Sequence, residues 1–221
     1  MKKVLSLFCL IALLATTVQK KKKVIFFGDS ITESAVKPGG FIIKIDSILQ
    51  KRNLKDNYEL IGSGISSNKI YDLYLRLEND VLSKNPDVVV IFIGVNDVWH
   101  KRSMGTGTDA DKFEKFYSAI LKKLADKNIK VIVCTPAAIG EKTDLTNELD
   151  GDLNKYCTII RTLSAKNNLP LIDLRKVFRE YNLKNNPENK DRGILTTDGV
   201  HLNVRGNILV AEEMLNTISK Q

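Results

Sequence analysis

Short runs of apolar residues alternate along the chain with longer stretches in which apolar residues recur at helical spacing. Strands are predicted at 24–27, 58–61, 88–93, 130–135 and 171–173. Helices are predicted at 41–52, 70–83, 111–128, 153–167 and 204–219. Three of the strands are rich in Val and Ile without alternation, which is typical of strands buried on both faces. The pattern therefore predicts an α/β fold with a parallel sheet of about five strands and crossover helices.

The first nineteen residues follow a different pattern. Lys2 and Lys3 precede an apolar stretch at 4–18, which is too short to span a bilayer comfortably. A charged start followed by a short apolar segment predicts a signal peptide at 1–19 and export to the periplasm or the extracellular space. The segment 15–19 lacks a clean Ala-x-Ala cleavage site, so a retained N-terminal membrane anchor is the alternative. The remaining residues, 20–221, show no linker, and we expect one domain there.

Composition narrows the possible partners of this domain. The 221 residues are 43% hydrophobic, which is enough to form a sizeable core and argues against disorder. The formal net charge is +8, but the lysines are scattered apart from a run at 20–23. No basic stripe is interleaved with aromatic residues, so a nucleic-acid partner is not expected.

The predicted loops fall at 31–40, 98–109, 136–152 and 183–198. In open α/β sheets, functional groups gather at the carboxyl ends of the strands, so we expect these loops to form the rim of a site. The loop at 98–109 contains Gly105 and Gly107 and is a candidate flap.

A serine directly follows the first predicted strand. The strand at 24–27 ends at Gly28-Asp29-Ser30, which places a hydroxyl at its carboxyl tip. Ester hydrolysis requires a nucleophile, a base, an acid that orients the base, and donors for the oxyanion. Ser30 fits the nucleophile, and its own N–H could face the oxyanion if a helical turn begins there. The alternative is that Asp29 and Ser30 only cap a helix.

A histidine near the C-terminus fits the base. His201 is one of two histidines and follows Asp198 by three residues. On one turn, these two side chains can face each other, so that Asp198 fixes the tautomer of the imidazole. A helix-capping Asp beside a surface His is the alternative. His100 lacks an equally placed acid and is interpreted as a rim residue.

Two further positions could supply oxyanion donors. Asn96 follows the apolar strand at 88–93 and offers a neutral amide at the sheet edge. Gly64 would present a backbone N–H without an obstructing side chain. Both residues could instead be ordinary turn residues.

The segments Gly28-Asp-Ser30-Ile, Gly64, Gly94-Val-Asn96-Asp97 and Asp198-Gly-Val-His201 together resemble the SGNH hydrolase family, also called GDSL lipases. The resemblance implies a three-layer α/β/α, flavodoxin-like domain that cleaves esters or thioesters without a metal or another cofactor. It also implies a catalytic triad of Ser30, Asp198 and His201. The oxyanion hole would comprise Gly64 N–H, Ser30 N–H and the Asn96 amide.

Two positions depart from that pattern. Ile31 replaces the Leu of the Gly-Asp-Ser-Leu signature, which conserves volume. The segment at 64–68 reads Gly-Ile-Ser-Ser-Asn, where related sequences often have another Gly after the first Ser. This second departure bears on the placement of Gly64, with Gly62 as the alternative.

The sequence therefore predicts an exported serine esterase that works through an acyl-enzyme intermediate. We expect a short acyl group, such as acetyl, on a small-molecule or carbohydrate substrate. Trp99 could stack on a sugar, or it could brace the loop. A lysophospholipase or acyl-thioesterase, and a non-catalytic binding module with the same fold, are the alternatives. A membrane partner is expected only if the N-terminal segment is retained.

Overall fold

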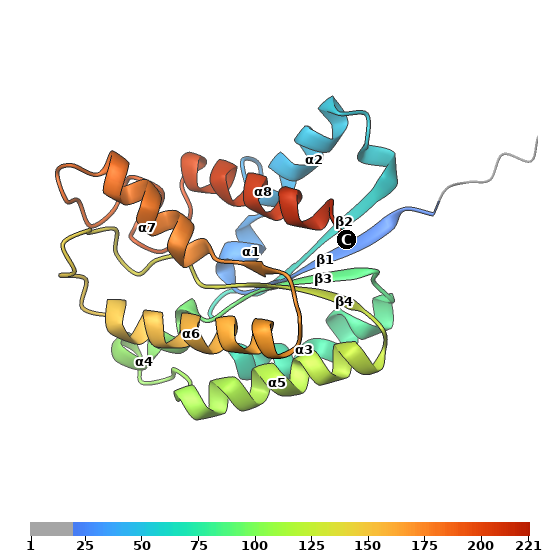
Figure 1. Ribbon diagram of the computed structural model, residues 1–221, viewed down its shortest axis with the longest axis horizontal. Coiled ribbons are helices and arrows are strands. Elements are labelled where there is room, and N and C mark those ends of the chain that lie inside the picture. The colour runs from blue at the N-terminus through green and yellow to red at the C-terminus, as the bar shows by residue number, and fades with distance from the viewer. Residues whose placement is uncertain (1–19) are drawn as a thin grey trace, which may run out of the picture.

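The computed structural model describes residues 20–221, in which a parallel sheet of five strands has the order β2-β1-β3-β4-β5 (Figure 1). The strands are β1 (Lys22–Gly28), β2 (Tyr58–Gly64), β3 (Val88–Phe92), β4 (Lys130–Cys134) and β5 (Leu171–Ile172). This is the flavodoxin-like strand order, in which ligands bind where the order reverses, between the carboxyl ends of β1 and β3. The predicted fold class is confirmed. The predicted signal peptide, 1–19, lies outside the described residues.

Helices cover both faces of the sheet and complete three layers (Figure 1). One face is covered by α1 (Ser30–Ser34), α2 (Phe41–Lys51), α7 (Leu174–Asn185) and α8 (Val204–Ile218). The other is covered by α3 (Ile70–Asp80), α4 (Val95–Ser103), α5 (Ala110–Asp126) and α6 (Asp150–Lys166). Two 3₁₀ turns, Lys55–Asn57 and Leu82–Lys84, precede β2 and β3. Among residues 20–221, no helix is both long enough and apolar enough to cross a membrane.

The apolar runs of the central strands supply side chains to both cores. In β1, Val24 and Phe26 pack toward α2 and α8, whereas Ile25 and Phe27 pack toward α3 and α5. Successive side chains of a strand point to opposite faces, so a strand covered on both sides must be apolar at every position. This requirement explains why β1 and β3 could be located from the sequence alone.

Three helices were not predicted, and each overlaps one of the predicted loops. The segment 31–40 begins within α1, and 98–109 begins within α4. The candidate flap after α4 is anchored to that helix, because the buried Thr108 donates its N–H to Asp97 O at 3.2 Å. The third helix, α7, begins directly after β5 and extends into the loop predicted at 183–198.

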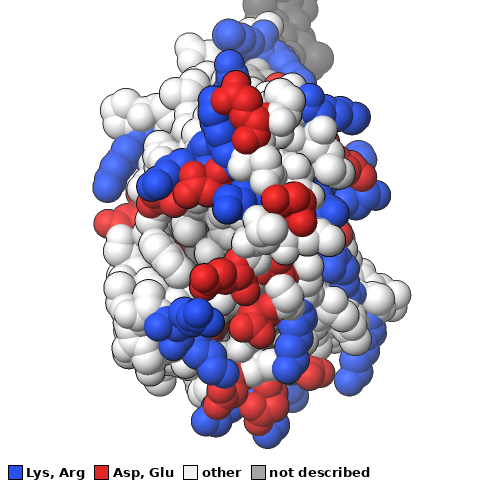
Figure 2. All heavy atoms as spheres, turned by 90° about the vertical axis from the view of Figure 1, so that its left-hand side faces the viewer, with Lys and Arg blue, Asp and Glu red and all other residues white. Residues whose placement is uncertain are grey.

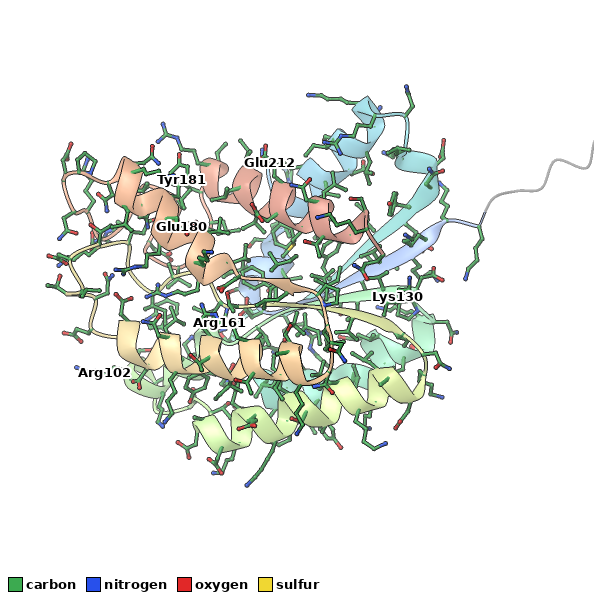
Figure 3. The ribbon with its side chains drawn as sticks, viewed as in Figure 1. Arg102, Lys130, Arg161, Glu180, Tyr181 and Glu212 are labelled. Carbon is green, nitrogen blue, oxygen red and sulfur yellow. The ribbon has the colours of Figure 1, made fainter. Side chains whose placement is uncertain are left out.

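The start of α7 is fixed from the opposite layer. Asp173 caps α7 by accepting the Lys176 N–H at 3.2 Å, which also ends β5 one residue before the predicted position. Arg161 extends from α6 toward this turn and donates to both Asp173 oxygens, at 2.8 and 2.9 Å (Figure 3). Such a bidentate pair is rigid, so it sets how α7 leaves the sheet.

Candidate active site

Three side chains that are distant in sequence meet at the carboxyl edge of the sheet. The Ser30 Oγ lies 3.0 Å from His201 Nε2, although 171 residues separate them. The His201 Nδ1 lies 2.7 Å from Asp198 Oδ2. Both distances are those of hydrogen bonds. The structure thus brings together the three residues predicted as a triad.

Asp198 and His201 share one tight turn just before α8. The second carboxylate oxygen, Oδ1, accepts the Val200 N–H at 2.9 Å and the His201 N–H at 2.8 Å. Burial by itself raises the pKa of Asp198, but the hydrogen bonds from the His201 side chain and the two N–H groups outweigh it. The net pKa lies below the usual value, so Asp198 is ionised at neutral pH and can orient the imidazole.

Ser30 is the first residue of α1, directly after β1. Asp29 caps this short helix, with its Oδ1 accepting the Ile31 N–H at 3.0 Å. Ser30 is only partly buried, whereas Asp29 and Ile31 on either side are buried. The hydroxyl is therefore held at an accessible edge by a turn whose flanks are packed.

Two glycines allow α1 to lie against the ends of β1 and β2. Gly28 and Gly64 are paired in the sheet register. A Cβ on Gly28 would collide with Phe92 O and the Thr32 side chain, and one on Gly64 would collide with the Glu33 N–H. Both positions therefore require glycine for close approach of the helix that begins with Ser30.

Asn96 lies in the first turn of α4 and is 2% exposed. Its Nδ2 donates to Asn68 O at 3.1 Å, which orients the amide and leaves one of its two N–H bonds for another acceptor. Trp99 follows three residues later, on the same side of α4. Its ring meets that of His201 edge-on, with centroids 6.3 Å apart. Trp99 thus borders His201, with Asn96 one turn earlier on the same side of α4, whereas the predicted roles of both residues stay predictions.

Gly64 has a packing role that the sequence did not show. The Ile65 N–H donates to Gly28 O at 3.3 Å, so the Gly64 N–H, one residue earlier, points away from β1. A residue that was not predicted offers another backbone donor. Ser67 stands in the turn after β2 with φ +65°, a conformation that favours glycine, and its N–H has no hydrogen-bond partner within residues 20–221. The Gly expected after Ser66 was the signal that could have identified this position.

Both basic and acidic side chains surround the site. Figure 2 views the carboxyl edge of the sheet from outside, and basic and acidic side chains are interspersed there with uncharged ones. His100 is buried against Trp99, with ring centroids 5.6 Å apart, so it is a packed residue of the rim. Within residues 20–221, no group of three or more His, Cys, Asp or Glu side chains is placed to hold a metal ion.

Two buried carboxyl groups beside the site make stability depend on pH. Burial, the dominant influence, raises the pKa of Asp29 and of Asp97 to about 7. Both groups have a pKa near 4 in an unfolded chain, so the unfolding free energy should fall as the pH rises from about 4 to about 7. Asp97→Asn should remove about 4 kcal/mol of that decline. Denaturant titrations across this range would measure it.

The exposed Asp56, changed to Asn, is the matched control and should leave the decline intact. An Asp97→Asn protein whose unfolding free energy keeps the full pH dependence of the wild type would contradict the assignment of this titration to Asp97.

Comparison with known proteins agrees with this geometry. A family model, described as the GDSL-like lipase/acylhydrolase family, matches residues 26–208. An acetylxylan esterase of Geobacillus stearothermophilus is 27% identical over 213 residues, which cover 89% of this chain and 94% of that protein. An isoamyl acetate-hydrolyzing esterase of Schizosaccharomyces pombe is 25% identical over 206 residues, covering 91% of this chain and 78% of that protein.

A solved structure is more similar. The crystal structure of an acetyl xylan esterase matches with a TM-score of 0.88 and 66% sequence identity, covering 89% of this chain and 99% of that one. The family model spans most of the described residues, including Ser30, Asn96, Asp198 and His201. The resemblance predicted from the sequence is confirmed, and the chain belongs to the GDSL-like lipase/acylhydrolase family.

Proposed function

We propose that this protein is a serine esterase that removes acetyl groups from a carbohydrate through an acyl-enzyme intermediate. The observation that carries the proposal is the hydrogen-bonded series Ser30–His201–Asp198 at the carboxyl edge of the sheet. The similarity to acetyl xylan esterases, 66% identical in one case, supports both the acetyl group and the sugar.

The first half of the reaction acylates Ser30. With its Nδ1–H donated to Asp198, the imidazole presents an unprotonated Nε2 to the Ser30 hydroxyl. His201 takes the hydroxyl proton while Oγ attacks the ester carbonyl carbon. The tetrahedral intermediate then collapses, and the sugar oxygen leaves with the proton from His201. Asp198 stabilises the imidazolium between these two transfers.

The second half repeats these proton transfers with water. His201 removes a proton from a water molecule, whose oxygen attacks the acetyl-Ser30 carbonyl carbon. Collapse of the second intermediate releases acetate and returns the proton to Ser30 Oγ. The half-exposed side chains of Asp198 and His201, 43% and 37% exposed, allow water to reach this position.

Three donors would stabilise the negative charge of the two intermediates. The Ser30 N–H and the second N–H bond of the Asn96 amide are the first two. Two backbone groups are candidates for the third donor, and the one predicted from the sequence is Gly64 N–H. The turn that contains Ser67 also borders Asn96, through the hydrogen bond from the Asn96 amide to Asn68 O, so Ser67 N–H is a better-supported third donor.

Trp99 is proposed to contact the sugar. Its indole is half-buried and lies edge-on to His201, so one part of the ring borders the position where the leaving alcohol would lie. Aromatic rings with one packed side and one accessible side are suited to hold an amphipathic ligand.

The acyl preference can be tested with nitrophenyl esters of increasing chain length. We expect kcat/KM for the acetate to exceed that for the decanoate by at least about 10-fold, because a site for a short acyl group has no room for eight more methylenes. Acetylated xylo-oligosaccharides should release acetate. Rates that rise with chain length would favour a lysophospholipase or thioesterase, and wild-type protein inert toward all these esters would favour a binding module.

A further inference from the structure

The proposed catalytic base, His201, and its partner Asp198 lie in an irregular segment, 186–203, between α7 and α8. The only strand-like pairing of this segment in the described chain is a single bridge from Thr196 to Leu202. Hydrogen bonds outside any regular sheet, from both backbone and side-chain groups, therefore help to fix the shape of the segment. A displacement of about 1 Å can slow an enzymatic step by about 10²-fold, so these contacts matter for the reaction.

Glu141 provides the most concentrated of these contacts. Its Oε2 accepts the Ile194 N–H at 2.8 Å, and its Oε1 accepts the N–H groups of Leu195 and Thr196 at 2.7 and 3.0 Å. The residue is only 1% exposed. One carboxylate thus holds three consecutive backbone groups of the segment, and hydrogen bonds to an ionised acceptor are stronger than neutral ones.

Glu141 lies in a second irregular stretch, between β4 and α6, and its backbone is tied to the same segment. Its N–H donates to Asp191 O at 2.9 Å, and its carbonyl accepts the Asn186 amide at 3.0 Å. The neighbouring Gly140 N–H donates to Gly199 O at 2.9 Å. The two irregular stretches therefore form one hydrogen-bonded unit, with the Glu141 carboxylate in its interior.

Thr196 connects this hydrogen-bonded unit to the turn that holds Asp198 and His201. The Thr196 N–H is held by Glu141, and its Oγ1 accepts the Gly199 N–H at 3.0 Å, within the turn of Asp198 and His201. The next residue, Thr197, donates its N–H to His201 O at 2.8 Å. Gly199 is thus bonded to Thr196, which Glu141 holds, and His201 is bonded to Thr197, the next residue along the chain.

We propose that Glu141 is a positioning residue for the esterase reaction. Its buried carboxylate fixes the backbone at 194–196 and thereby holds the Asp198–His201 turn at hydrogen-bonding distance from Ser30. Glu141 does not touch the reacting atoms. This inference rests on the proposed function for its kinetic consequence, but its geometric consequence can be measured without substrate.

Glu141→Gln is the informative variant. Glutamine has the same shape, but its NH₂ group would face a backbone N–H that now finds a carboxylate oxygen, which leaves two donors opposed. We expect kcat for an acetate ester to fall about 10- to 100-fold with KM nearly unchanged. The acid limb of the pH–rate profile should move to lower pH, because the imidazolium loses stabilisation by Asp198.

Proton NMR provides the readout that is independent of activity. The short Nδ1–H bond from His201 to Asp198 should give a downfield resonance, identified by its loss in His201→Ala. The resonance should weaken or move upfield in Glu141→Gln. Glu148→Gln is the matched control, because Glu148 is an exposed acid of the same stretch whose one ion pair among residues 20–221 is with Arg102. It should keep the wild-type resonance, kcat and pH profile.

A milder variant covers the case in which Glu141→Gln does not fold. Thr196→Val keeps the shape and removes the acceptor of the Gly199 N–H, so the same three readouts should change in the same direction. A folded Glu141→Gln protein with wild-type kcat, pH profile and resonance would overturn the proposal. So would a lower melting temperature with an unchanged resonance and unchanged kcat per folded molecule. If wild-type protein hydrolyses no ester, the proposed function fails, whereas the resonance still tests Glu141.

Discussion

Replacing Ser30 by alanine should lower kcat for acetate-ester hydrolysis by about 10⁵- to 10⁶-fold. The variant lacks the oxygen that attacks the carbonyl, and no acyl-enzyme can form. The fold should be unaffected, because within residues 20–221 the Ser30 Oγ hydrogen-bonds only to His201 and Ser30 is partly exposed. The residual rate would come from binding and from the oxyanion donors, which alone accelerate related reactions over water.

The measurement compares initial rates of the purified proteins with nitrophenyl acetate. Equal melting temperatures of variant and wild type would show that both are folded. Ser34→Ala is the control, since Ser34 ends the same helix and is exposed. It should retain nearly full activity. If Ser30→Ala instead hydrolyses the acetate within about tenfold of the wild type, Ser30 is not the nucleophile.

Replacing His201 by alanine should reduce kcat by a similar factor, about 10⁵-fold or more. Without the imidazole, the Ser30 hydroxyl keeps its proton and remains a weak nucleophile. Wild-type activity should also fall on the acid side, as the imidazole takes up a proton and can no longer accept one from Ser30. Stopped assays over a range of pH, together with the variant, would test both statements.

The double variant, Ser30→Ala with His201→Ala, should be no slower than either single variant. Residues that act as one unit are strongly non-additive, because removing either one abolishes the same step. His100→Asn is the control for losing a histidine, and it should keep activity within a fewfold of the wild type. Effects of the two single changes that multiply in the double variant would mean that Ser30 and His201 act in separate steps.

The sheet was predictable because its central strands are apolar at every position. The predicted strands at 24–27 and 88–93 lie within a few residues of β1 and β3, and continuous Val and Ile runs are typical of strands buried on both faces. The helices with a clear apolar stripe, such as α5, were located equally well.

The missed helices bury polar side chains, which hydrophobic periodicity cannot detect. In α7, the buried positions include Arg175 and Asn182 beside Leu174 and Phe178. Arg175 is held by an ion pair with Asp150 at 2.5 Å, and such a partner is distant in sequence. In α4, the buried residues Asn96, Asp97 and His100 interrupt the apolar pattern in the same way.

The proximity of Ser30, Asp198 and His201 was predictable because local motifs and the sheet edge together define it. The contacts that hold the segment 186–203, with Asp198 and His201, in place were not predictable. Glu141 appeared to be one charged residue in a long loop, and its partners are three backbone N–H groups more than fifty positions later. Backbone donors have no sequence signature, so only coordinates could reveal this contact.

Ser30 follows the first strand and His201 precedes the last helix, so the chemistry depends on the two extremes of the folded domain. In a growing polypeptide, the nucleophile therefore precedes by 171 positions the base that activates it. Truncation just before the Asp198–His201 turn would keep all five strands but remove the base. Hydrolysis therefore requires both segments to be present and folded against each other.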